Sequence, residues 1–223
     1  MKVIKHSVEL VASTMQPNQL LEAVGRTCYK SEDKITEDSA SRFVEMATQR
    51  GHHSVIEHAS ATFRIITDRG ITHEIVRHRL ASYSQESTRY RNYGWQDMQF
   101  VVPQWMVGRE ASDEYAMWMR ACTYAENMYK MLIDRDVKPQ VARSVLPNCL
   151  KTEIVMTANF REWRHFCSLR ASAGAHPDIR IIAYAIWGRL LGLSSAVFAD
   201  LDTNDMCVAA NLYEDYYYGY EGM

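Results

Sequence analysis

The stretch that decides the fold reads LKTEIVMTANFREWRHFCSLR and spans residues 150–170. Over residues 150–158, apolar and polar side chains alternate, which is the pattern of a half-buried strand. Asn159 can then cap a helix whose inner face carries Trp163 and Phe166. A strand that runs directly into an amphipathic helix predicts a fold that mixes sheet and helix.

The other periodic segments support this prediction. Strands are predicted at residues 2–11 and 59–67, and helices at residues 17–29, 37–50, 71–79, 112–134, 139–146 and 177–192. In the helix at residues 37–50, Thr36 is expected to be the cap and Gly51 to end the helix. Gly70 is expected to end the strand pattern of residues 59–67, and residues 81–95 show no apolar period. Because strands and helices do not alternate regularly, we expect an α+β fold in which helices, one of them long, flank an antiparallel sheet.

Length and composition limit the classes of protein. The chain has 223 residues with 47% hydrophobic and 23% charged residues, values typical of globular proteins. We expect a single catalytic domain over residues 1–212 and a mobile, tyrosine-rich tail over residues 213–223. No apolar run is long enough to cross a bilayer, and the first residues do not resemble a secretory signal. The sequence therefore predicts a cytoplasmic protein.

Several common sites are excluded by spacing. The ten glycines include no GxG, so neither the dinucleotide fingerprint nor the phosphate loop of nucleotide hydrolases is present. The five cysteines contain no CxxC pair, and we expect most of them to be buried. His73 and His78 lie five residues apart, whereas zinc proteases need histidines four apart on one helix face. We therefore expect no metal site.

The basic residues point to an anionic ligand. The chain has 18 Arg against 7 Lys, and between Lys34 and Lys130 there are ten Arg and no Lys. Arginine binds phosphate and carboxylate groups in a planar, bidentate way that lysine cannot reproduce. Composition alone leaves open that these arginines only keep the surface soluble.

Residues 77–93 concentrate this chemistry. They contain four Arg, four Ser or Thr and three Tyr, with few apolar side chains to bury. Such a segment suits a phosphorylated, planar ligand, since arginines and hydroxyls bind phosphate and tyrosine rings stack on a base. Two alternatives remain at this point: a solvated surface loop, and a groove for single-stranded nucleic acid formed by residues 77–95.

The same segment resembles the flavin-dependent thymidylate synthases, the ThyX family. Their signature is Arg-His-Arg, seven residues and Ser, which here is Arg77-His78-Arg79 and Ser87. Further landmarks lie upstream at residues 51–58 and downstream at residues 142–147, 159–161 and 169–170, in family order between about residues 7 and 192.

The resemblance implies an α+β homotetramer that binds FAD at subunit interfaces and methylates dUMP to dTMP. It implies 5,10-methylenetetrahydrofolate as the one-carbon donor and NADPH as the reductant of the flavin. Matched positions for the flavin are Ser54, Arg77, His78, Arg79, Gln85, Asn159, Arg161 and His165. Matched positions for dUMP are Glu74, Arg77, Gln85, Glu86, Ser87, Thr88, Arg89, Arg143 and Arg170.

Two matched residues are implied to act in catalysis. Arg170 would polarise the pyrimidine ring, and His52 would lie near the flavin ring. No cysteine is placed as a nucleophile, in agreement with the absence of a nucleophile motif. Four positions depart from the commoner family pattern, namely Glu74, Ser84, Gln85 and His165. A flavin enzyme acting on another uracil compound is a further alternative.

Overall fold

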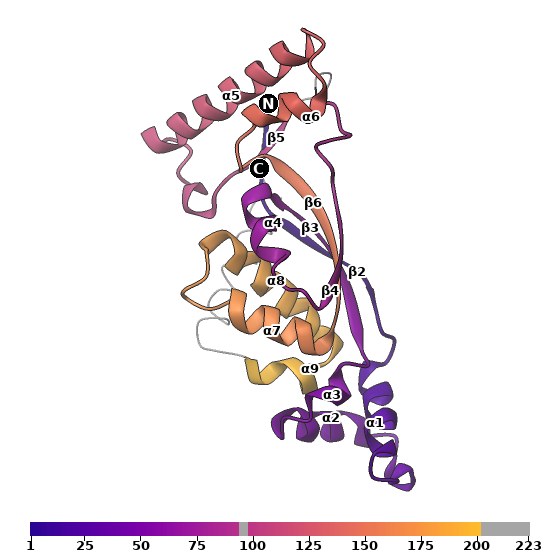
Figure 1. The fold of residues 1–223 in the computed structure, drawn as a ribbon. Helices are drawn as coiled ribbons and strands as arrows, with labels where there is room; N and C mark the ends of the chain where they lie inside the picture. Colours follow the sequence, from indigo (N-terminus) through magenta and orange to yellow (C-terminus); the bar gives the residue numbers. More distant parts are fainter. Residues whose placement is uncertain (94–97, 202–223) are drawn as a thin grey trace. The chain divides into compact units, whose positions relative to one another are not determined.

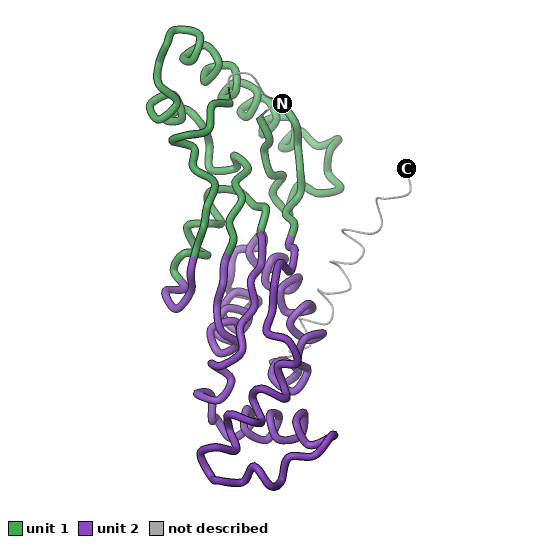
Figure 2. Tube along the Cα trace, turned by 90° about the vertical axis from the view of Figure 1, so that its right-hand side faces the viewer, with its two compact units in different colours: residues 1–7, 65–77, 83–155 green, residues 8–64, 78–82, 156–223 purple. Residues whose placement is uncertain are grey.

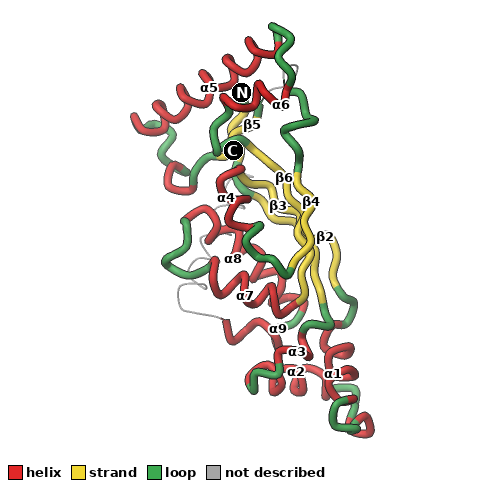
Figure 3. Tube along the Cα trace, in the orientation of Figure 1, coloured by secondary structure: helices red, strands yellow, loops and turns green. Residues whose placement is uncertain are grey.

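The computed structural model describes residues 1–93 and 98–201 (Figure 1). A four-stranded sheet has the strand order β2-β3-β6-β4, and β1 and β5 form a separate parallel pair. The strands are β1 (Lys2–Ile4), β2 (Ser7–Ser13), β3 (Ser60–Asp68), β4 (Ala81–Gln85), β5 (Gln99–Val101) and β6 (Lys151–Asn159). The predicted α+β class with an antiparallel sheet is confirmed (Figure 3).

The chain divides into two compact units, each built from separate segments (Figure 2). Unit 1 contains residues 1–7, 65–77 and 83–155. Unit 2 contains residues 8–64 and 78–82 together with the chain from residue 156 onward. The division cuts through the long strands β3 and β6. The single domain over residues 1–212 stays a prediction.

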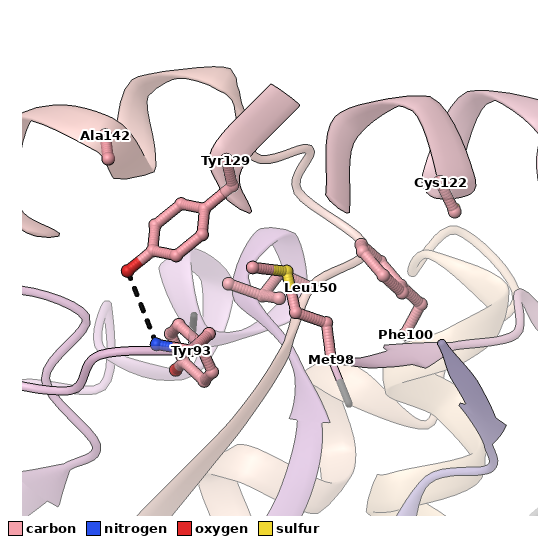
Figure 4. Packing of buried hydrophobic residues seen from close by; sticks show 7 residues of the cluster. All are labelled: Tyr93, Met98, Phe100, Cys122, Tyr129, Ala142 and Leu150. Atoms are coloured by element: carbon pink, nitrogen blue, oxygen red, sulfur yellow. Dashed lines mark hydrogen bonds between the residues drawn. The ribbon is translucent and has the colours of Figure 1, made fainter. Parts of the chain in front are cut away.

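Unit 1 is built around a long helix and a cluster of buried side chains. Its helices are α4 (Arg69–Ile75), α5 (Asp113–Ile133) and α6 (Pro139–Ala142), with 3-10 turns η2 (Gln104–Met106) and η3 (Arg143–Val145). Ser112 caps α5 by accepting a hydrogen bond from the Tyr115 N–H at 3.2 Å. The cluster contains Tyr93, Met98, Phe100, Cys122, Tyr129, Ala142 and Leu150 (Figure 4). In it the Tyr93 N–H donates to the Tyr129 hydroxyl at 3.4 Å.

Unit 2 packs helices against its part of the sheet. Its helices are α1 (Pro17–Thr27), α2 (Ser39–Gln49), α3 (His53–Ile56), α7 (Phe160–Arg170), α8 (Pro177–Leu193) and α9 (Ser195–Phe198), with 3-10 turns η1 (Glu32–Lys34) and η4 (Ala199–Leu201). Trp163 of α7 is fully buried, donates its indole N–H to the Ala61 carbonyl at 3.0 Å and meets Phe63 edge to face. This contact attaches α7 to β3.

Most predicted elements are confirmed, including the cap at Asn159, whose side chain accepts from the Glu162 N–H at 2.9 Å. Gly51, with φ of +76°, follows the end of α2 as expected. Of the described cysteines, Cys122 and Cys167 are buried as expected, whereas Cys28 is exposed. No helix in residues 1–93 and 98–201 is both long and apolar enough to cross a membrane.

Several local predictions are wrong. Residues 2–11 form two strands, because the chain between β1 and β2 turns inward at His6, whose ring bonds Thr67 at 2.9 Å. Thr36 does not cap α2; its N–H instead donates to Ser39 at 2.8 Å. β3 ends at Asp68, just before Gly70, as expected, but the helix that follows begins at Arg69 and ends at Ile75 rather than spanning residues 71–79.

The largest omission is β4, which lies in the segment that shows no apolar period. It is an edge strand of the larger sheet, so its backbone hydrogen bonds hold it in place without a row of buried side chains. β5 and α9 were also not predicted, since each is too short to show a period. The tail at residues 213–223 lies outside the described residues.

Candidate functional site

Unit 1 contains a cavity of about 430 Å³. Arg69, the first residue of α4, lines it from the end of β3, and Arg143 lines it from the 3-10 turn after α6. The full lining is Arg69, Thr88, Gln140, Arg143, Ser144, Leu146, Pro147, Asn148 and Leu150. Two arginines in one small cavity provide the positive charge that an anionic ligand requires.

The loop after β4 is bonded to this cavity. The Arg143 Nη1 donates to the Thr88 hydroxyl at 2.9 Å, and Thr88 is buried. The Arg89 Nε donates to the side-chain amide oxygen Oε1 of Gln140 at 3.4 Å. The structure therefore brings together three residues that the resemblance matches to the dUMP site, namely Thr88, Arg89 and Arg143.

Arg69 was missed by the sequence analysis. Its Nη1 atom is buried and has no hydrogen-bond partner, although its backbone N–H donates to the Asn148 carbonyl at 2.9 Å. Buried guanidinium nitrogens are almost always paired, so an unpaired one is unusual in a residue that lines a cavity, and Arg69 is a candidate for contact with an anion. The only signal in the sequence was the excess of arginine, which does not single out one position.

Glu86 and Gln85 act as supports rather than as cavity lining. The Glu86 carboxylate accepts from Lys151 and pairs with Arg91, both at 2.8 Å, and accepts from the Tyr93 hydroxyl at 3.2 Å. Burial and the adjacent Glu86 charge raise the pKa of Tyr93, so this phenol stays protonated. The Gln85 amide donates to Thr72 at 3.0 Å. These bonds fix both ends of the loop that carries Thr88.

Three other residues matched to dUMP do not line the cavity. Ser87 is exposed, and its hydroxyl accepts from the Arg89 N–H at 3.3 Å. Arg77 is exposed, and its Nε donates to the His73 carbonyl at 3.2 Å. Glu74 lies half-buried in α4. Their roles toward a substrate stay predictions.

Unit 2 contains a second group of matched residues, centred on His78. The His78 Nδ1 lies 3.0 Å from the Glu162 carboxylate, and the Arg170 Nε donates to the His78 Nε2 at 3.1 Å. The His165 ring stands 5.3 Å from the His78 ring. Burial lowers the pKa of His78, so its imidazole is neutral at neutral pH. Glu162 was not predicted from the sequence.

The remaining flavin positions lie on exposed parts of unit 2. His52 directly precedes α3 and Ser54 lies in it, and both are exposed. Arg161 of α7 pairs with Glu57 at 2.6 Å, and this ion pair is itself solvent-accessible. Arg79 is exposed. Asn159 uses its side-chain oxygen as the cap of α7. Exposed arginines and hydroxyls of this kind suit the diphosphate of a dinucleotide such as FAD.

Comparison with known proteins decides the family. Residues 9–191 match the protein family described as thymidylate synthase complementing protein. The chain belongs to the flavin-dependent thymidylate synthase family. The family resemblance carried by the Arg-His-Arg signature is thereby confirmed.

Two bacterial proteins of this family illustrate the similarity. A flavin-dependent thymidylate synthase of Mycobacterium tuberculosis (strain ATCC 25618 / H37Rv) is 38% identical over 204 residues, which cover 84% of this chain and 80% of that protein. Another, from Mycobacterium sp. (strain JLS), is 38% identical over 203 residues, which cover 82% of this chain and 79% of that protein.

Solved structures agree with this assignment. The UMP/dUMP methylase PolB from Streptomyces cacaoi, solved with 5-Br dUMP, has a TM-score of 0.74 at 25% identity and covers 89% of this chain and 96% of its own. ThyX from Helicobacter pylori, solved with FAD and dUMP, has a TM-score of 0.71 at 22% identity and covers 88% of this chain and 98% of its own. The latter likeness shows the fold.

Proposed function

We propose that this enzyme methylates dUMP to dTMP, with 5,10-methylenetetrahydrofolate as one-carbon donor and NADPH-reduced FAD as hydride source. Membership of the flavin-dependent thymidylate synthase family supports the reaction class. Within the structure, the observation that carries the proposal is the cavity that both Arg69 and Arg143 line.

The cavity fits the phosphate end of a nucleoside monophosphate. Arg69 and Arg143 supply two guanidinium groups, and Thr88 supplies a hydroxyl that Arg143 already holds at 2.9 Å. A volume of about 430 Å³ is within the usual range for small-molecule sites. Charge-assisted hydrogen bonds from such groups are the strongest contacts that proteins make with phosphate. We assign this cavity to the phosphate of dUMP.

The flavin positions belong to the same proposal. Arg79, Arg161 and Ser54 offer exposed donors of the kind that FAD requires. His52 directly precedes α3, the helix that contains Ser54. When bound, FAD supplies the hydride, and the protein orients it. Arg170 is assigned to the pyrimidine, where a guanidinium favours ionisation of N3 and makes C5 a better nucleophile. No cysteine is found among the described residues that line the cavity.

Three further statements rest on the family resemblance and are proposed with it. The enzyme is a homotetramer, its flavin and dUMP sites lie at subunit interfaces, and it works in the cytoplasm. Size-exclusion chromatography with light scattering measures the first statement directly. A mass other than four times the 25.7 kDa chain would contradict it.

The test of the reaction is formation of dTMP from dUMP with the folate donor, FAD and NADPH present at saturation. Arg143→Ala should raise the KM for dUMP by roughly ten- to a hundredfold, since it removes a charge-assisted phosphate contact. Arg120→Ala is the matched control, because Arg120 is an exposed arginine of α5 outside the cavity. If the wild-type protein forms no dTMP under these conditions, the proposal fails.

A second substrate is worth the same assay, because the structural relative from Streptomyces cacaoi is named a UMP/dUMP methylase. Comparing kcat/KM for UMP and dUMP separates the two substrates. The nucleic-acid alternative makes a different prediction, namely a steeply salt-dependent affinity for oligonucleotides. None of the relatives described above is named as a nucleic-acid-binding protein.

A further inference from the structure

Both ring nitrogens of the buried His78 are engaged by residues of α7. Nδ1 lies 3.0 Å from Oε1 of Glu162, and Nε2 lies 3.1 Å from Nε of Arg170. His78 is 3% exposed and Glu162 is 6% exposed, so water does not compete freely for either contact. The side of the ring faces Phe166 at 4.8 Å between centroids.

The chemistry of the three groups fixes the position of the imidazole proton. An arginine Nε can only donate, so Nε2 of His78 has to accept with its lone pair. The proton of the neutral ring therefore lies on Nδ1, from which it is donated to the Glu162 carboxylate. The result is a chain of donation that runs from Arg170 to His78 and from His78 to Glu162.

We propose that Glu162 and His78 are positioning residues for Arg170. The Glu162 carboxylate keeps His78 in the Nδ1–H tautomer, and the free lone pair of Nε2 then holds the Nε edge of the Arg170 guanidinium. This holds the plane of the guanidinium in one orientation. The proposal rests on the proposed function for the catalytic role of Arg170, but the hydrogen-bond chain itself does not depend on it.

A metal ion is a poorer explanation of the same residues. Ligand atoms of His78, Glu162 and His165 lie within 4.8 Å of one another, which is close enough for shared coordination. However, a metal would need a lone pair of His78, and the one on Nε2 already accepts from Arg170. The guanidinium would also lie beside the cation and repel it. The trio is therefore better explained as the support of Arg170.

The charges around His78 make the chain sensitive to pH in a defined way. Burial lowers the pKa of His78, Arg170 and His165 lower it further, and Glu162 raises it. Arg170, His165 and Glu162 all belong to α7. Protonation of His78 places a proton on Nε2, which ends its bond to Arg170. Activity should therefore fall on the acid side as His78 becomes charged.

The test uses side-chain nitrogen NMR of the FAD-loaded enzyme without substrate, followed by pH-rate profiles. The wild-type spectrum should show His78 protonated on Nδ1 and an Arg170 Nε–H that exchanges slowly with water. Glu162→Ala should mix the tautomers, speed this exchange and lower kcat by about 10- to 100-fold with little change in the KM for dUMP. Glu162→Gln keeps an acceptor oxygen, so it should retain the tautomer and most of kcat.

The charge of Glu162 provides the second readout. Glu162→Gln removes the group that raises the pKa of His78, so the acid limb of the pH-rate profile should move to lower pH. Asp200→Asn is the matched control, because it removes another carboxylate that pairs with α7, through Arg164. This variant should change neither the His78 tautomer nor the pH-rate profile.

Three results would overturn the proposal: a wild-type His78 protonated on Nε2, unchanged Arg170 exchange in Glu162→Ala, or an unmoved acid limb in Glu162→Gln. If Glu162→Ala does not fold, the acid limb of the pH-rate profile of Glu162→Gln tests the proposal instead. A wild-type enzyme that has the tautomer and the slow exchange but forms no dTMP would instead refute the proposed function and leave the hydrogen-bond chain standing.

Discussion

Replacing Arg69 by methionine should weaken dUMP binding without destabilising the ligand-free protein. Methionine retains an unbranched apolar stem of similar reach and removes the guanidinium. The Nη1 atom of Arg69 is buried without a hydrogen-bond partner, and such an atom costs about 1–3 kcal/mol of stability. The rest of the side chain is half-buried and partly solvated, so the gain in the free energy of unfolding should lie at the lower end of this range.

The loss in binding follows from removal of the guanidinium of a residue that lines the cavity. A hydrogen bond to a charged group contributes about 1.5–3 kcal/mol, and 1.4 kcal/mol corresponds to a tenfold change in Kd. Arg69→Met should therefore raise the Kd of dUMP by about 10- to 150-fold. Deoxyuridine lacks the phosphate, so its Kd should not change. Titration calorimetry with both ligands measures the two effects, and urea unfolding measures the stability of the ligand-free protein.

Two results would refute this reasoning. If Arg69→Met binds dUMP as tightly as the wild-type protein, Arg69 is not a phosphate ligand. If the variant loses dUMP affinity and deoxyuridine affinity together, or loses several kcal/mol of stability, the guanidinium supports the fold of unit 1 and affects binding only indirectly. Arg120→Ala should leave all three measurements unchanged, since Arg120 is exposed on α5.

Three further predictions concern unit 2. Asn159→Ala should lower the free energy of unfolding by about 1 kcal/mol in urea, because it removes the cap of α7, whereas Asn159→Asp should be close to neutral. Cys167 should resist alkylation until the protein unfolds, since burial raises the pKa of its thiol, while exposed Cys28 should react; peptide mass mapping distinguishes them. The hydrogen bond from Arg164 lowers the pKa of Asp200, so their pairing stabilises the fold above the ordinary aspartate pKa and is lost as pH falls through the lowered one. Acid unfolding of Asp200→Asn should lack this contribution.

The sequence predicted those elements whose apolar period is set by burial. The strand at residues 151–159 and helix α7 are examples, because alternate residues of the strand and one face of the helix are buried. β4 carries little buried surface, and the backbone bonds of a sheet edge hold it, so its side chains show no apolar alternation. The cap expected at Thr36 is not formed, since no side chain caps α2 and the Ser39 hydroxyl instead accepts from the Thr36 N–H.

The site was predicted in part for a similar reason. Thr88, Arg89 and Arg143 lie close together as the signature implied, whereas Arg69 and Glu162 were missed. Arg69 is singled out because its buried Nη1 atom has no hydrogen-bond partner. Glu162 is singled out because it contacts His78, which lies 84 positions away in the sequence. Neither property is visible in local spacing. Only the assembled structure shows which arginine lacks a partner and which carboxylate orients a histidine.

The excess of arginine over lysine has a structural explanation at three positions. Arg164 uses two nitrogens to bond both carboxylate oxygens of Asp200, a contact that secures the end of α9. Arg170 offers its Nε to His78, and Arg69, which lines the cavity, has one buried Nη without a partner. A guanidinium has separate donors on a rigid plane, so the protein can hold one edge while another faces a ligand. A lysine has one ammonium and cannot divide its donors in this way. Arg170→Lys should therefore keep the positive charge but lose the fixed orientation, and the His78 tautomer should no longer be coupled to catalysis.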